Sequence, residues 1–113
     1  MNDQFRRWAG HDPAQVWAAP GRVNLIGEHT DYNGGFVLPI AIDRYTTVAA
    51  GGRDDGVVAA HSLDVPDDGG WTKYVDGVVQ ALRAEGVHVG GADVLVSSAV
   101  PTGAGLSSSA ALE

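Results

Sequence analysis

Apolar and polar residues alternate over much of the first half of the chain, which is typical of β-strands. Strands are predicted at residues 15–19, 23–26, 36–50 and 57–61. Pro20-Gly21 interrupts the first two segments, and 36–50 gives the strongest strand signal because it is rich in Val, Ile, Thr and Tyr. A turn at 51–56 separates the last two segments, so we expect those two to pair as a hairpin.

The second half of the chain changes to a helical period. Residues 71–85 form one apolar stripe at helical spacing, made by Trp71, Val75, Val78, Val79 and Leu82. Gly86 follows where a glycine commonly ends a helix. A strand at 93–97, a glycine loop at 101–105 and the start of another helix come next. Strands first and then helix, strand, helix predict an α+β fold.

Composition narrows the class of protein. The 113 residues are 44% hydrophobic, as in one small globular domain, and contain no cysteine, which excludes disulfide scaffolds and thiolate chemistry. A net charge of −7 argues against nucleic acid as a partner. The sequence shows no signal peptide and no apolar run long enough for a membrane span, so we expect a cytoplasmic protein with no membrane partner.

The loop between the last predicted strand and helix has the composition of a phosphate site. Val100 to Ala111 reads Val-Pro-Thr-Gly-Ala-Gly-Leu-Ser-Ser-Ser-Ala-Ala. Glycines allow a close backbone approach to a ligand, and the serine triplet adds hydroxyl donors and a hard oxygen suited to Mg²⁺. The loop has no lysine of the Walker type. A plain turn with a serine that caps a helix is the alternative.

A second polar cluster follows Gly21 and contains Arg22, Glu28, His29 and Asp31. Carboxylates and an imidazole so close together can bind neighbouring hydroxyls, as a sugar requires. Arg22 can stabilise charge on a transferred phosphoryl group. A metal site, a solvated turn and a local salt bridge with Arg22 are the alternatives.

The two clusters together resemble one family. Residues 21–39, Gly-Arg-Val-Asn-Leu-Ile-Gly-Glu-His-Thr-Asp-Tyr-Asn-Gly-Gly-Phe-Val-Leu-Pro, resemble the N-terminal signature of galactokinases, and 101–110 resemble the second motif of the wider GHMP small-molecule kinases. The resemblance implies an α+β fold, the incomplete N-terminal domain of a GHMP kinase (ribosomal protein S5 domain 2-like), with a mixed sheet and helices on one face. It also implies ATP-dependent phosphorylation of galactose at its C1 hydroxyl.

The resemblance assigns roles to particular residues. It makes Arg22 the catalytic arginine that stabilises the transition state. The implied galactose-binding residues are Glu28, His29, Thr30 and Asp31. The implied ATP-binding residues are Ser62, Gly103, Ala104, Gly105, Leu106, Ser107, Ser108 and Ser109. Ser109 is also the implied Mg²⁺ ligand, a choice that chemistry alone leaves open among the three serines.

The family carries further parts that these residues do not supply, including an Asp base, an acidic Mg²⁺ ligand and a second domain. We therefore expect an N-terminal part of a longer chain, inactive by itself and monomeric when complete. The alternatives are a non-catalytic sugar sensor, an N-acetylgalactosamine kinase and a degraded gene fragment. The acids expected to be surface charges are Asp43, Asp76 and Asp93. The histidines expected at the surface or simply packed are His11, His61 and His88. Trp71 is expected in the core.

Overall fold

The computed structural model describes residues 1–27, 33–67, 70–103 and 105–112. Its helices are α1 (Asn2–Ala9), α2 (Thr72–Ala84) and α3 (Ser108–Leu112). Its strands are β1 (Gln15–Ile26), β2 (Leu38–Arg53), β3 (Val58–Ser62) and β4 (Gly91–Ser98). Every predicted strand is present, and the first two predicted segments form one strand whose pairing is irregular between Pro20 and Arg22.

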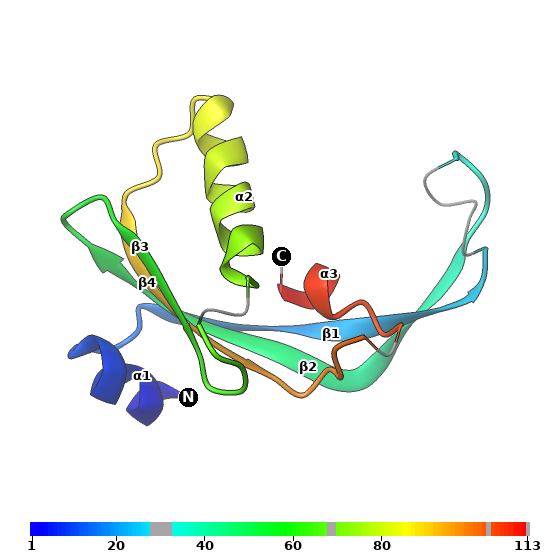
Figure 1. Cartoon of the computed structure of the whole chain (residues 1–113), viewed down its shortest axis with the longest axis horizontal. Helices are drawn as coiled ribbons and strands as arrows, with labels where there is room; N and C mark the ends of the chain where they lie inside the picture. Colours follow the sequence, from blue (N-terminus) through cyan, green and yellow to red (C-terminus); the bar gives the residue numbers. More distant parts are fainter. Residues whose placement is uncertain (28–32, 68–69, 104, 113) are drawn as a thin grey trace.

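The strands form one mixed sheet in the order β1-β2-β4-β3 (Figure 1). β1 and β4 pair antiparallel with β2, whereas β3 pairs parallel with β4. Two adjacent parallel strands need a crossover connection, and α2 provides it. The α+β prediction with a mixed sheet is confirmed.

The predicted hairpin between β2 and β3 is wrong. β4 lies between these strands, and Gly51 of β2 pairs with Asp93 of β4. The turn after β2 does bend the chain back, because Asp55 accepts hydrogen bonds from Arg53 and from the backbone N–H of Val57. On the edge away from β1, however, the strand that pairs with β2 comes from about 40 residues later in the chain, and a local turn pattern carries no information about it.

The two faces of the sheet are covered by different helices. α2 and α3 lie on one face, where Val48, Val94 and Val96 border a small gap beneath α2. Neighbouring residues in a strand point to opposite faces, so Ala49 and Leu95 face the other way and pack against Phe5 of α1. The sequence predicts helices on one face, and α2 and α3 follow it, but α1, which the sequence patterns do not predict, covers the opposite face.

α2 matches its prediction to within a residue at each end. Glu85 ends the helix, and Gly86 follows with a φ of 80°, a left-handed value that glycine adopts without steric cost. None of the α2 residues is buried, so the apolar stripe is only partly covered by the sheet.

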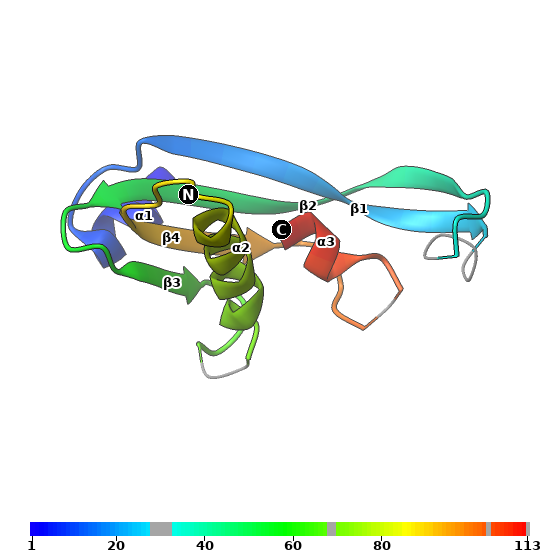
Figure 2. The same ribbon diagram turned by 90° about the horizontal axis from the view of Figure 1, so that it is seen from above.

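β1 and β2 extend beyond the rest of the sheet as a two-stranded projection, which we call the ribbon (residues 22–27 and 33–41) (Figure 2). The chain measures 44 × 32 × 25 Å with a radius of gyration of 15.5 Å. A compact chain of this length would have a radius of about 13 Å, and the ribbon accounts for the difference. Among the described helices, none has the length and apolar character to cross a membrane.

Candidate functional site

The segment that follows Gly21 and the glycine-serine loop meet at the base of the ribbon. The backbone N–H of Arg22 donates to the carbonyl oxygen of Leu106 at 2.9 Å. A Cβ atom on Gly21 would lie 2.9 Å from that same oxygen and 3.0 Å from Cγ1 of Val100, so only glycine allows this approach. The Arg22 guanidinium donates through Nη2 to Ser107 Oγ at 3.3 Å. Two segments about 85 residues apart in sequence therefore share one site.

The glycine-serine loop is folded by left-handed backbone conformations. Gly103 and Gly105 each have a φ of 72°, and Ser107 has a φ of 56°. A positive φ is uncommon for a residue with a side chain and marks a constrained position. The carbonyl oxygen of Ser107 accepts the backbone N–H of Ala111 at 3.0 Å, which starts α3. The strain thus lies where the loop passes Arg22.

A cavity of about 540 Å³ opens between the loop, β4 and the start of α2. Ser108 and Ser109 face it from α3, and Ser62 faces it from the end of β3. Its other lining residues are Thr46, Asp64, Val65, Trp71, Tyr74, Val96, Ser98, Ala99, Val100, Pro101, Thr102 and Leu112. The cavity is large enough for a small-molecule ligand and combines an apolar wall with several hydroxyl groups.

A smaller cavity of about 330 Å³ lies on the other side of α3. It carries Arg22 and Ser107, together with Pro20, Gly21, Pro39, Ala41, Ala110 and Ala111. Consecutive serines therefore face different spaces, with Ser107 in the smaller cavity and Ser108 and Ser109 in the larger. The start of α3 forms the wall between the two.

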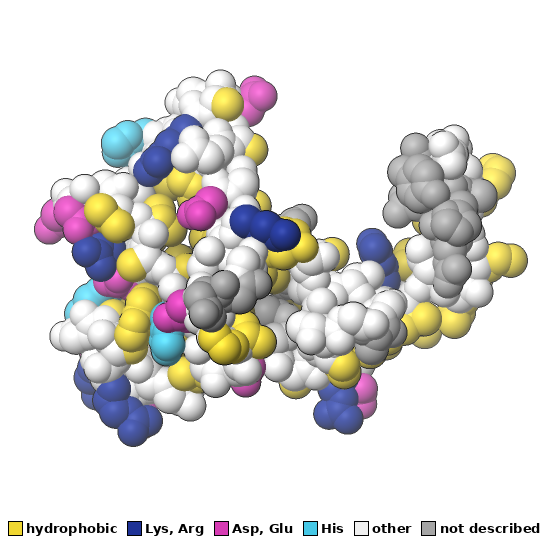
Figure 3. All heavy atoms as spheres, viewed as in Figure 1, with side chains coloured by type: hydrophobic (Ala, Val, Ile, Leu, Met, Phe, Trp, Pro, Cys, Tyr) yellow, Lys and Arg dark blue, Asp and Glu magenta, His cyan; other side chains and the backbone are white. Residues whose placement is uncertain are grey.

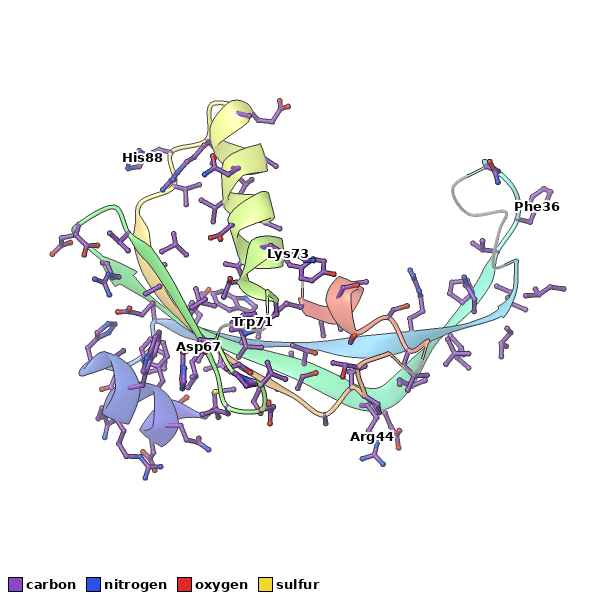
Figure 4. The ribbon with its side chains drawn as sticks, in the orientation of Figure 1. Phe36, Arg44, Asp67, Trp71, Lys73 and His88 are labelled. Atoms are coloured by element: carbon purple, nitrogen blue, oxygen red, sulfur yellow. The ribbon has the colours of Figure 1, made fainter. Side chains whose placement is uncertain are left out.

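Two features of the larger cavity bear on ligand binding. Ser62 is buried, and its hydroxyl accepts the backbone N–H groups of Asp64 and Val65 at 3.2 and 3.3 Å. Trp71 borders the cavity at the start of α2 (Figure 4), and its indole Nε1 is buried with no hydrogen-bond partner within the described parts of the chain. A buried donor normally has a partner, so this indole N–H is an exception among the described residues.

Several predicted site residues lie outside the described residues. They are the sugar-contacting candidates Glu28, His29, Thr30 and Asp31, and Ala104 in the glycine loop. The described residues on either side, Gly27 and Asn33, belong to the ribbon.

The predictions for the remaining acids are confirmed in two cases and wrong in one. Asp43 and Asp76 are exposed, as expected. The prediction that Asp93 is a surface charge is wrong, since its exposed fraction is 5%. Asp93 accepts hydrogen bonds from His11 Nε2 at 2.9 Å and from Arg53 Nη1 at 2.8 Å. Burial opposes ionisation of the Asp93 carboxyl, but these two partners outweigh it and hold the pKa of the group below its ordinary value.

The histidines have more specific environments than sequence reasoning indicates. His61 stacks on Trp8 with ring centroids 5.5 Å apart and pairs with Asp67 at 2.8 Å. The hydrogen bond from His61 lowers the pKa of the Asp67 carboxyl. His61 and Ser62 are adjacent, so they point to opposite faces of β3, one toward α1 and one toward the larger cavity. A preceding helix and a downstream acid create these contacts, and neither is visible in the local sequence.

The described residues hold no group of three or more His, Asp or Glu side chains that would form a metal site by themselves. Mg²⁺ in phosphoryl-transfer sites takes few protein ligands and several phosphate oxygens. The hydroxyl of Ser109 is a hard oxygen that faces the larger cavity, so its chemistry fits one such ligand.

Comparison with known proteins gives a consistent family. Residues 3–52 match the family model "galactokinase galactose-binding signature", and residues 73–113 match "GHMP kinases N terminal domain". The galactokinase of Streptomyces coelicolor is 50% identical over 127 residues, which include all of this chain and 33% of the relative. The galactokinase of Roseiflexus sp. is 50% identical over 125 residues, with 100% and 32% covered. The chain thus spans about a third of the length of these curated relatives.

Solved structures agree. A crystal structure of Lactococcus lactis galactokinase complexed with galactose superposes with a TM-score of 0.83 at 37% identity, over 99% of this chain and 33% of that one. The mevalonate kinase of Methanococcus jannaschii superposes with a TM-score of 0.66 at 22% identity, over 87% of this chain and 36% of that one, which shows a shared fold. Over its whole length the chain is therefore similar to galactokinases, and it shares a fold with mevalonate kinase, over a stretch that corresponds to about one third of the length of these relatives.

Proposed function

We propose that this chain forms part of a galactokinase, which transfers the γ-phosphoryl group of ATP to the C1 hydroxyl of galactose. The observation that carries the proposal is the contact between Arg22 and the glycine-serine loop, at the wall between two cavities. Phosphoryl transfer requires a donor and an acceptor on either side of one reacting group, with positive charge beside it. The galactokinase relatives and the galactose complex of the Lactococcus lactis enzyme support the choice of sugar.

The larger cavity suits the nucleotide in this proposal. The loop from Gly103 to Ser109 presents a backbone that a phosphate can approach closely, because its glycines carry no side chain. Ser62 and Ser109 both line this cavity, and Trp71 borders it at the start of α2. We assign the triphosphate to Gly103, Ala104, Gly105, Leu106, Ser107, Ser108 and Ser109.

The smaller cavity and the ribbon suit the sugar. Residues 28–31 connect the two strands of the ribbon, whose base carries Arg22. Their carboxylates, imidazole and hydroxyl would accept and donate hydrogen bonds to the hydroxyl groups of galactose. Arg22 would then face both the acceptor hydroxyl and the transferred phosphoryl group, and its fixed charge would stabilise the transition state.

Mg²⁺ would neutralise charge on the phosphate oxygens when it is bound, with Ser109 as a protein ligand. The part played by the protein is positioning: the Arg22–Ser107 hydrogen bond and the Leu106 contact hold the arginine and the loop at a fixed separation. Positioning of this kind lowers the barrier for in-line transfer without covalent chemistry by the protein.

The test uses a chimaera in which this chain replaces the corresponding third of the Streptomyces coelicolor galactokinase. Arg22→Ala should lower kcat for galactose phosphorylation by about 100- to 1000-fold, because one donor to the transition state is lost. The KM values for galactose and ATP should stay within about threefold. The matched control is Arg44→Ala, because Arg44 is exposed and points away from the face that α3 covers (Figure 4).

Arg44→Ala should leave kcat and both KM values unchanged. An Arg22→Ala enzyme that loses affinity and keeps its kcat would show that Arg22 only binds substrate. A chimaera that folds and binds ATP but does not phosphorylate galactose would contradict the proposed activity.

A further inference from the structure

One aspartate ties together two walls of the larger cavity that are formed by separate parts of the chain. The first wall is the turn after β3, residues 62–65, and the second is the segment from Ser98 to Thr102 that leads into the glycine loop. Asp64 Oδ2 accepts the backbone N–H of Ser98 at 2.7 Å. This is a short, charge-assisted hydrogen bond between residues 34 positions apart.

The hydrogen bond between Asp64 and Ser98 lies just beyond the end of the backbone pairing between β3 and β4. The backbone N–H of Leu63 still donates to Val96 O at 2.9 Å, as in a regular parallel pair. The chain then turns away, because the Ser62 hydroxyl accepts the N–H groups of Asp64 and Val65. The Asp64 carboxylate therefore takes the place that a backbone carbonyl would fill beside Ser98.

The network continues from Ser98 to the glycine loop. Ser98 Oγ lies 2.7 Å from Thr46 Oγ1 and accepts the backbone N–H of Val100 at 3.2 Å. Thr46 and Val100 are both buried, with exposed fractions of 2% and 3%. A Cβ atom on Gly21 would lie 3.0 Å from Cγ1 of Val100, so the Val100 side chain packs the start of the loop closely against β1. Ser62, Asp64, Ser98 and Val100 thus form one chain of hydrogen bonds across the cavity.

We propose that Asp64 is a positioning residue, which holds the glycine loop at a fixed distance from the Ser62 wall and so sets the width of the nucleotide cavity. The proposal rests on the proposed function for the identity of the ligand. The anchoring of the loop rests on the hydrogen bonds alone and can be measured without any nucleotide.

The test compares Asp64→Ala and Asp64→Asn with Asp76→Ala, an exposed aspartate on α2. The first measurement is amide hydrogen exchange, without nucleotide, of the chimaera that carries this chain. Asp64→Ala should speed exchange at Ser98 and Val100 by about tenfold, because the Ser98 N–H loses its acceptor. The faster exchange should extend into residues 102–106. Asp64→Asn keeps an acceptor oxygen and should stay within about threefold of wild type.

The second measurement is a calorimetric titration of the same proteins with Mg·ATP and with Mg·tripolyphosphate. Asp64→Ala should weaken both by about five- to twentyfold, and Asp64→Asn should restore most of the affinity. Asp76→Ala should match wild type in both measurements. If Asp64 only stabilised the fold, Asp64→Ala would lower the unfolding midpoint, and Asp64→Asn would not restore the affinity.

Three outcomes would overturn the proposal. The first is unchanged exchange beyond Ser98 in Asp64→Ala. The second is unchanged affinity in a variant whose loop exchanges faster. The third is tighter Mg·ATP binding by Asp64→Asn, which would show that the carboxylate merely repels phosphate. If Asp64→Ala does not fold, Asp64→Asn is used instead. The proposal then predicts a shift of the Ser98 amide resonance, and an unchanged resonance would contradict it. A wild-type chimaera that binds no ATP would contradict the proposed function, and the exchange measurement would still decide the anchor.

Discussion

The two ends of the sheet differ in how much of their apolar side chains they bury. At the α1 end, Phe5 is fully buried against Ala49 and Leu95, and nearby charges are paired. In the ribbon, the strands pair through their backbones, yet the apolar side chains of Leu25, Ile26, Phe36, Leu38 and Ile40 are more than half exposed. The space-filling view shows hydrophobic side chains along the ribbon (Figure 3).

The difference teaches where this part of the chain obtains its stability. A two-stranded ribbon alone is marginally stable in water, because it buries little apolar surface. The α1 end supplies a core, whereas the ribbon supplies candidate ligand-binding residues. The described part of the ribbon is therefore attached to a stable sheet but contributes little to its stability.

The strongest test of this contrast removes one phenylalanine from each end. Phe5→Ala should lower the free energy of unfolding by about 3–5 kcal/mol, because it leaves a cavity among Ala49, Leu95 and Trp8. Phe36 is 98% exposed and points away from the ribbon (Figure 4), so Phe36→Ala should change that free energy by less than about 0.5 kcal/mol. Urea unfolding measures both.

Equal effects of the two substitutions would mean that the ribbon is packed in solution and that the contrast between the ends does not hold. A Phe5→Ala chain that is unfolded without urea would agree with the prediction, provided that Phe36→Ala unfolds at the wild-type midpoint.

The α1 end also shows how far sequence patterns reach. The long strand at 36–50 and the helix at 71–85 are predicted well, because their periods extend over many residues. α1 is missed because eight residues with one buried side chain give little periodic signal. The pairing of β3 with β4 is missed because it depends on a strand added later in the chain.

The candidate site, too, is only partly predictable from the sequence. The glycine loop and Arg22 are found from the sequence, because glycine, serine and arginine have direct chemical roles there. Their contact through Leu106 and Ser107 needs the fold to bring two distant segments together. The burial of the Trp71 indole N–H and the hydrogen bond between Asp64 and Ser98 depend on the fold, and no local sequence pattern encodes them.

The second test concerns the charges at the α1 end. Asp93→Asn should destabilise the chain by about 2 kcal/mol, because it removes a buried carboxylate that accepts from both His11 and Arg53. Arg53 keeps its pair with Asp55, which limits the loss. The control is Asp54→Asn in the exposed turn after β2, which should stay within about 0.5 kcal/mol of wild type. Thermal or urea unfolding at pH 6 distinguishes the two, and equal stabilities would show that the buried pairs contribute nothing.

The smallest expected effect is the pH dependence of the pair that joins His11 to Asp93. The Nδ1 atom of His11 lies 3.0 Å from the carbonyl oxygen of Asp12, and Nε2 lies 2.9 Å from Asp93 Oδ2. Both partners are acceptors, so both ring nitrogens donate and the ring is an imidazolium. Chiefly the hydrogen bond to Asp93, with further help from Asp12, raises the pKa of His11 above its ordinary value.

A raised pKa in the folded state means that protonated His11 stabilises the fold. This contribution is complete below the unfolded pKa of about 6.5 and is lost as pH rises through the higher folded value. The lowered pKa of Asp93 adds stability that is present above about pH 3.9 and is lost as pH falls through its folded value. The pair should therefore stabilise the chain most between about pH 4 and pH 6.5.

Urea unfolding at pH 6 and pH 9 tests this, with His11→Gln and the exposed His88→Gln compared to wild type. The destabilisation caused by His11→Gln should be larger at pH 6 than at pH 9, and smaller than that of Asp93→Asn at either pH. His88→Gln should show the same stability as wild type at both pH values. A His11 ring that titrates at or below its unfolded value by NMR would show that the imidazolium pair does not form, and the α1 end would then depend on its apolar core alone.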